Sequence, residues 1–186
     1  MAPLATTTEL ETYTGLTFEQ ARSDMLLEQV SAAVRNYCRW HVAPSHVDTV
    51  TVDGSGADVL KLPTLFLTAL TSVTENAEAL DLDDLEWTEA GYLKRSTPWT
   101  RKLRGVVAVI EHGYTEVPLE VREIVMNAAA RGLLTPAGGV VRDQESIGDY
   151  SLGTTYSQIG FNQAGGSALM DHEKTILDTY RIPNPA

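Results

Sequence analysis

The stretch LRGVVAVIEHGYTEVPLEVREIVMNAAARG, residues 103–132, decides the fold of this chain. It begins with an apolar run rich in branched residues, 106–110, which favours a buried strand because such side chains suit a pleated surface. After a Gly-containing corner, Pro118 suits the first position of a helix, where a residue without an N–H loses nothing. Apolar residues then follow near-helical spacing as far as Gly132, a typical helix end. The stretch predicts a central strand joined to a packing helix, which is architecture and not chemistry.

A long helix is predicted upstream, over residues 18–41. Apolar side chains recur there at helical spacing, and Pro44 prevents the helix from continuing. Thr17 and Gln20 have the spacing of a capping box, which would satisfy the first free amides of this helix. Residues 1–16 are rich in Thr, Ala and Gly without a sustained period, and are predicted to form a loose arm.

Short strands separated by turn residues are predicted between the two helices. Segments 47–52 and 59–62 flank the turn-forming residues 53–56 and predict one hairpin. Further strands are predicted at 65–74, at 85–88 and 92–94 as a second hairpin around 89–91, and at 106–111. Strands grouped between helices, without the alternation of a parallel sheet, predict an α+β fold with a small antiparallel sheet.

The chain after Gly132 is rich in glycine and weakly periodic. It is predicted to be an extended arm, 133–186, with a terminal helix over 168–180, because long irregular stretches in domains are usually functional or disordered. The predicted parts are therefore an arm at 1–16, a helix-plus-sheet body at 17–132, and the second arm. Deleting residues 133–186 is expected to leave a folded body.

Composition limits the possible functions. A chain of 186 residues with 43% apolar residues can bury a core, and 14 basic against 25 acidic residues give a formal charge of −11. Such a field opposes direct wrapping of DNA. The lone cysteine, Cys38, excludes an intrachain disulfide, and no signal peptide or apolar membrane-spanning run is evident. We expect a soluble, cytoplasmically made protein.

No catalytic, cofactor-binding or metal-binding residue is predicted. The four histidines lie far apart in sequence and form no ligand pair on one element, so packed or surface histidines are the more common interpretation. The acidic run 81–86 lacks the loop length and central glycine of an EF-hand, so an acidic turn is favoured. There is no Gly-x-Ser-x-Gly or phosphate-binding loop, and Cys38 beside Tyr37 and Trp40 is predicted to be a small buried side chain.

One cluster of basic residues stands out between the last two predicted strands. It contains an aromatic residue and comprises Lys94, Arg95, Trp99, Arg101, Lys102 and Arg104. Such a cluster could contact nucleic acid. It could also neutralise an acidic neighbouring subunit, which a chain of charge −11 needs in order to self-associate. The second interpretation is favoured.

An ordered set of short motifs resembles the head-to-tail connector adaptors of tailed phages, most closely those from phages of actinobacteria. The motifs are YCRWHVAP at 37–44, VTVDGSG at 50–56, LKLP at 60–63, Val73, LEW at 85–87 with GYL at 91–93, Trp99, VIEHGY at 109–114 with Val117 and Pro118, and ESIGDYS at 145–151. The similarity runs from about 17 to 152.

This resemblance implies a structural protein of the virion neck. Such adaptors form a ring, typically of twelve subunits, beneath the portal protein at the capsid vertex, and a downstream head-completion or tail-terminator protein docks on them. DNA passes through the ring without specific binding, and no cofactor, membrane or catalytic residue is implied. The predicted subunit or portal interface comprises Lys94, Arg95, Trp99, Arg101, Lys102, Arg104, Glu145, Ile147, Asp149 and Tyr150.

Two alternatives remain open at this point. One is a small metal-dependent enzyme using Asp81, Asp83, Asp84 and a histidine. The other is a DNA-packaging accessory protein that binds nucleic acid through the basic cluster.

Overall fold

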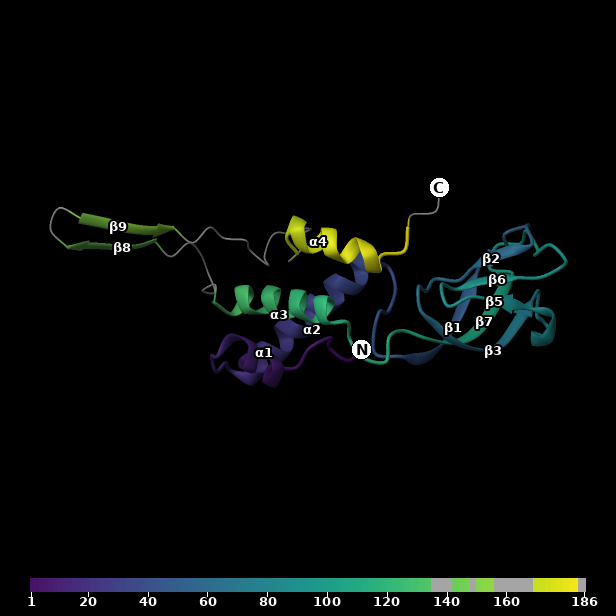
Figure 1. The fold of residues 1–186 in the computed structure, drawn as a ribbon, viewed down its shortest axis with the longest axis horizontal. Coiled ribbons are helices and arrows are strands. Elements are labelled where there is room, and N and C mark those ends of the chain that lie inside the picture. Colours follow the sequence, from purple (N-terminus) through teal and green to yellow (C-terminus); the bar gives the residue numbers. More distant parts are fainter. Residues whose placement is uncertain (135–141, 148–149, 156–168, 184–186) are drawn as a thin grey trace. The chain divides into compact units, whose positions relative to one another are not determined.

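Figure 1 shows the computed structural model, which describes residues 1–134, 142–147, 150–155 and 169–183. The elements form an α+β fold, as predicted. The chain divides into a helical unit, residues 1–34 with 122–173, and a β-rich unit, residues 35–121 with 174–186. Within the described ranges, no helix is long and apolar enough to cross a membrane.

The helical unit begins with a helix that the sequence analysis did not predict, α1 (Thr7–Thr14). Thr6 and Glu9 form its capping box: the Thr6 hydroxyl accepts a hydrogen bond from the Glu9 amide, and the Glu9 carboxylate accepts one from the Thr6 amide. Leu4 and Leu10 are buried. The expectation of a loose arm at 1–16 was therefore wrong, because this segment contributes apolar side chains to the interior.

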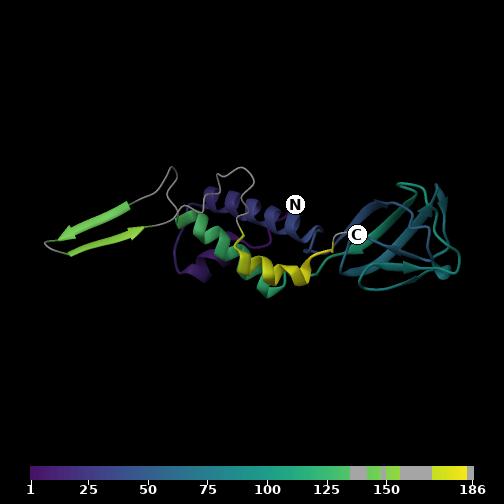
Figure 2. The same cartoon turned by 90° about the horizontal axis from the view of Figure 1, so that it is seen from above.

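Two longer helices accompany α1, as Figures 1 and 2 show. They are α2 (Gln20–Cys38) and α3 (Leu119–Leu134), and both agree with the predicted helices to within a few residues. Helix α2 begins at Gln20, so Thr17 does not cap it in the predicted way. Two polar contacts tie α1 to the longer helices, Tyr13 Oη to Asn127 Oδ1 (3.1 Å) and Arg122 to Glu9 (3.1 Å), and the residue Leu4 before α1 donates its amide to Ser31 Oγ (2.9 Å).

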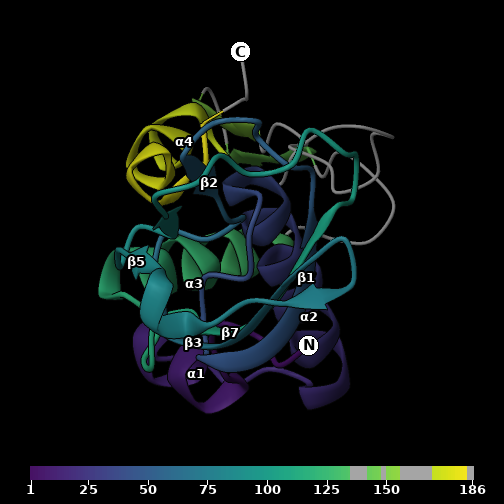
Figure 3. The ribbon, with the colours of Figure 1, turned by 90° about the vertical axis from the view of Figure 1, so that its right-hand side faces the viewer.

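The β-rich unit is organised around β7 (Val106–His112), the strand on which the sequence analysis was based. It lies inside a four-stranded sheet of order β1-β7-β3-β4, with β1 (His46–Val52), β3 (Leu67–Glu75) and β4 (Glu78–Ala79). Burial alternates along β7, so one face points into the core. Figure 3 shows β1, β7 and β3 side by side.

A second, three-stranded sheet has the order β2-β6-β5, with β2 (Val59–Lys61), β6 (Tyr92–Lys94) and β5 (Glu86–Trp87). The predicted hairpin of 85–88 with 92–94 is confirmed, because β5 pairs with β6. The predicted pairing of 47–52 with 59–62 is wrong: β1 pairs with β7 and β2 pairs with β6. The residues between β1 and β2 bond to the 100–102 backbone instead of forming a tight turn.

The two sheets share one hydrophobic core. It is formed by Val50, Leu60, Leu62, Leu67, Val73, Leu85, Leu93, Trp99, Val106, Ala108 and Ile110. Because these side chains come from both sheets and from the loop after β6, the sheets and that loop are stabilised by the same burial of apolar surface.

The C-terminal part contains more regular structure than the extended arm that was predicted. Two strands, β8 (Arg142–Ile147) and β9 (Tyr150–Thr155), pair antiparallel. The predicted terminal helix is present as α4 (Asp171–Leu177), followed by a 3-10 turn, η2 (Asp178–Tyr180).

Candidate subunit interface

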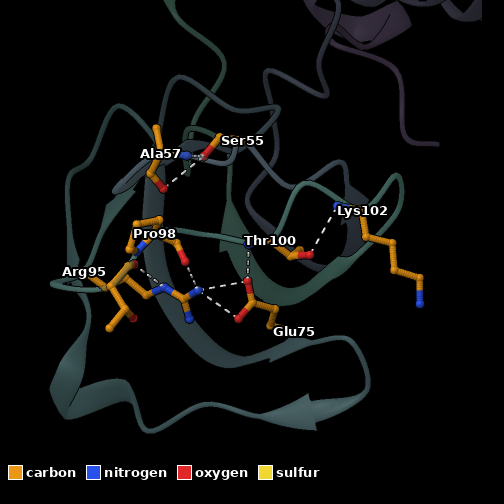
Figure 4. Close-up of polar contacts among 8 residues, drawn as sticks. Ser55, Ala57, Glu75, Arg95, Pro98, Thr100 and Lys102 are labelled. Atoms are coloured by element: carbon orange, nitrogen blue, oxygen red, sulfur yellow. Dashed lines mark hydrogen bonds and ion pairs between the residues drawn. The ribbon is translucent and has the colours of Figure 1, made fainter.

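The loop after β6, residues 95–104, carries half of the predicted interface residues and is anchored by an ion pair. Arg95 Nη2 lies 2.9 and 2.8 Å from the two carboxylate oxygens of Glu75, at the end of β3. The same guanidinium donates to the Thr97 and Pro98 carbonyls, each at 2.8 Å, and its Cζ lies 4.3 Å from the Trp99 ring centroid. Figure 4 shows the Arg95 side chain directed at Glu75. Arg95 thus fixes the loop that follows it.

Glu75 also accepts a hydrogen bond from the Thr100 amide, at 2.6 Å. Burial alone would raise the pKa of Glu75, but the Thr100 hydrogen bond and the Arg95 guanidinium together lower that pKa below its ordinary value of 4.5. The carboxylate is therefore ionised at neutral pH, and it holds the start and the middle of the loop.

A second loop, residues 53–57, contacts residues 100–102 of the loop after β6. Gly54 N donates to Lys102 O (3.0 Å) and Gly56 N to Thr100 O (3.1 Å). A Cβ atom at Gly54 would lie 2.0 Å from Thr100 O, so this close approach of two backbones requires glycine. The turn residues of the sequence thus serve a contact between loops, which explains why they do not close a hairpin.

The end of the supported loop is exposed and cationic. We call residues Arg101, Lys102, Leu103 and Arg104 the basic tip; all four are exposed, Leu103 to 75%. Its backbone is held where the Arg104 amide donates to Asp53 Oδ1 at 2.6 Å. Among the residues that the structure describes, the three cationic side chains have no ion-pair partner. The tip therefore presents three positive side chains that form no ion pair within the described residues.

The structure separates the six predicted residues of the basic cluster into two groups. Lys94 is exposed at the end of β6 and pairs with the exposed Glu86 at 3.4 Å, and the tip residues are also exposed. Trp99 and the Arg95 side chain are 2% and 10% exposed, respectively, so they belong to the interior. The Glu75 ion pair and the shared core bury Arg95 and Trp99 within this chain, and their role in an interface stays a prediction.

The other predicted interface residues belong to the C-terminal hairpin. Glu145 and Ile147 lie in β8, and Tyr150 opens β9 opposite Ile147. Asp149 lies outside the described residues. Their role in an interface stays a prediction.

Stability should depend on the protonation of Glu75. The pKa of Glu75 is lower in the folded chain than its ordinary value of 4.5. Ionised Glu75 therefore stabilises the fold fully at pH values above 4.5, and this contribution is lost as the pH falls through the lowered pKa. We expect Glu75→Gln to be less stable than the parent at pH 7, with the gap in free energy of unfolding narrowing below pH 4.5. Urea unfolding of both proteins between neutral pH and about pH 3 measures this gap. Parallel pH profiles would contradict the assignment.

The acidic run 81–86 and Cys38 were the other residues considered for metal binding or catalysis, and the structure gives each of them a structural role. The acidic run 81–86 forms a turn that leads into β5 at Glu86, as predicted: Asp81 accepts a hydrogen bond from the Asp83 amide (3.1 Å) and caps η1 (Leu82–Asp84), whose carboxylates are exposed. Cys38 is fully buried, as predicted, and burial raises the pKa of its thiol to about 12. The thiol is therefore protonated at neutral pH and is a poor nucleophile.

Three of the four histidines meet, contrary to what their sequence spacing suggested. The ring centroid of His46 lies 4.0 Å from that of His41 and 5.0 Å from that of His112. Burial, followed by the charge of His46, lowers the pKa of His112, and burial is also the main cause that lowers the pKa of His41 to about 4. Asp48 joins His46 and His112 in a group whose potential ligand atoms all lie within 4.8 Å of one another. Sequence spacing missed this group because strand pairing, not local spacing, brings it together.

The fold recurs in the neck of phage-like particles. The chain is similar to a chain of the neck of a native GTA (gene transfer agent) particle computed with C12 symmetry, with 11% identity and a TM-score of 0.57, over 100% of this chain and 94% of that chain. It is also similar to a chain of the neck of an empty GTA particle computed with C6 symmetry, with 13% identity and a TM-score of 0.56, over 76% of this chain and 84% of that chain. No protein-family model and no curated protein matches it. At such identities the similarity establishes a shared fold.

Proposed function

We propose that this chain is a structural adaptor of a tailed-phage or phage-like neck, which forms a ring beneath the portal and continues the DNA channel. The observation that carries the proposal is the fold similarity to a neck chain over 100% of this chain. The ordered motifs that resemble connector adaptors of phages of actinobacteria support it independently. The C12 symmetry of that neck is consistent with a ring of twelve subunits.

The basic tip is suited to contacts between subunits of such a ring. A ring closes through heterologous contacts, in which one patch of a subunit meets a different patch of the next. The three cationic side chains at the tip have no ion-pair partner in the described part of the chain, and the full sequence has a formal charge of −11. An acidic face of a neighbouring subunit or of the portal would supply that counter-charge, while the exposed Leu103 adds apolar surface.

The acidic character of the chain fits a channel through which DNA moves. A net negative subunit repels phosphate groups and therefore does not retain the DNA. In this role the chain carries out no catalytic step and needs no cofactor. Downstream head-completion or tail-terminator proteins would dock on the ring.

Reversing the charge of the basic tip is expected to prevent incorporation into the neck. The variant carries Arg101→Glu, Lys102→Glu and Arg104→Glu, and its incorporation into particles, measured by mass spectrometry, should fall at least about tenfold because like charges would now face each other. A matched variant with Arg101→Lys and Arg104→Lys keeps the charge and should be incorporated normally. Equal incorporation of both variants would rule out a role for the charge of the tip.

Cryo-electron microscopy of particles that contain the chain tests the proposal directly. Density for the chain between portal and tail supports it, and absence of the chain from the neck refutes it. A DNA mobility-shift assay at low salt separates the alternative of a packaging accessory, since salt-sensitive binding through the basic tip would favour that alternative.

A further inference from the structure

The pairing of β1 with β7 creates a cluster of metal-binding side chains that the proposed function does not use. His46 lies directly opposite His112 in the antiparallel register. Asp48 follows His46 by two residues, so both project from the same face of β1. One potential ligand atom from each of the three residues lies within 4.8 Å of the other two.

Three of the four ring nitrogens of His46 and His112 are buried and have no hydrogen-bond partner among the described residues. Both ring nitrogens of His112, a side chain only 3% exposed, are buried without a hydrogen bond in the described part of the chain. The same holds for Nδ1 of His46. A buried polar atom without a partner is costly, and native proteins leave few of them, so these nitrogens point to a missing ligand.

We propose that His46, Asp48 and His112 bind a divalent first-row transition-metal ion, with zinc as the fitting physiological ion. Two imidazole nitrogens and one carboxylate oxygen form a ligand set that proteins use for zinc and its neighbours. Four ligands at zinc bond lengths lie about 3.3 Å apart, so binding requires the three side chains to close by small rotations from their spacing of at most 4.8 Å.

His41 adds a further donor beside this set. Its Nε2 lies 2.6 Å from the Pro44 carbonyl, which can only accept, so Nε2 carries the proton and Nδ1 is left with a lone pair. That Nδ1 is buried and has no partner among the described residues. The Arg35 guanidinium donates to the His41 and Ala43 carbonyls at 2.9 and 2.8 Å, which fixes this segment. A bound ion would therefore link β1 to β7 at the point where the chain enters the sheet from α2.

Metal titration of the tag-free, full-length chain tests the site. After removal of metals with a chelator, Zn²⁺ should bind with one ion per chain and raise the melting temperature. Co²⁺ should give the visible absorption of a tetrahedral ion with nitrogen and oxygen ligands. If neither Zn²⁺ nor Co²⁺ binds, the proposal is overturned.

Two variants locate the binding. Asp48 is exposed and asparagine has nearly the same shape, so Asp48→Asn should keep the fold. The loss of the carboxylate should weaken Zn²⁺ binding at least about tenfold. His172→Asn removes a histidine of α4 outside the cluster and should bind Zn²⁺ like the parent. If the His112→Asn variant folds, it should lose the visible absorption of bound Co²⁺. If it does not fold, the Zn²⁺ affinity of Asp48→Asn tests the site instead. Stoichiometric binding that Asp48→Asn leaves unchanged would also overturn the proposal.

Discussion

Replacing Arg95 by methionine is expected to lower the free energy of unfolding by about 3 kcal/mol, because breaking a buried ion pair leaves an uncompensated charge. Glu75, whose side chain is only 15% exposed, would keep its carboxylate without the guanidinium. The Thr97 and Pro98 carbonyls would lose their donor, and Trp99 would lose the cation above its ring. Methionine fills a similar volume without charge, so the loss reflects these polar contacts more than a cavity.

Lys94→Met is the matched control for this prediction. Lys94 precedes Arg95 and also pairs with a glutamate, but that pair is exposed to solvent. Exposed pairs contribute about 0.5 kcal/mol, so Lys94→Met should unfold close to the parent. Chemical denaturation at pH 7 measures both variants. If Arg95→Met and Lys94→Met shift the midpoint equally, the Glu75 ion pair does not anchor the loop.

The central strand and its packing helix could be predicted because their signals are local. The branched run of β7 and the helical spacing of α3 are each contained in about a dozen residues, and the structure places them as expected. The partner of β1 could not be predicted in this way. The glycines of residues 53–56 suggested a hairpin, and their use in a contact with residues 100–102 depends on chain that lies far along the sequence.

Other features were missed for different reasons. The capping box of α1 was visible, since Thr6 and Glu9 have the required spacing, but the weak apolar period concealed the helix. Arg95 pairs with Glu75 from β3, and Trp99 is buried among core residues of both sheets; no local pattern identifies these distant partners. The same is true of His46 and His112, which strand register alone brings together.

Deleting residues 171–186 is expected to remove most of the stability of the fold, although the sequence alone suggested that a longer deletion, 133–186, would leave the body intact. In the helical unit, the Glu173 carboxylate is buried and accepts hydrogen bonds from Arg131 at 2.7 and 2.9 Å. It also accepts the Met170 amide, at 2.7 Å. Loss of this partly buried pair alone costs several kcal/mol.

In the β-rich unit, the same segment supplies partners to buried groups. Trp40 Nε1 donates to the Tyr180 carbonyl at 2.7 Å, and the Ile182 amide donates to the Cys38 carbonyl at 3.0 Å. Tyr180 Oη donates to Glu120 at 2.6 Å, and burial, followed by this hydrogen bond, raises the pKa of Tyr180 to about 12. Removing the segment leaves the Trp40 indole without this acceptor.

Together these losses should exceed about 5 kcal/mol, which is comparable to the whole stability of an ordinary domain. We expect the truncated chain to show no cooperative unfolding transition by circular dichroism.

Two adjacent residues give a finer test: Leu177 is fully buried and Leu177→Ala should cost about 3 kcal/mol. Ile176 is 42% exposed, so Ile176→Ala should cost under about 1 kcal/mol. If the truncated chain unfolds cooperatively at the parent's midpoint, the prediction is wrong, because the buried contacts of residues 171–186 would then contribute nothing to the stability of the fold.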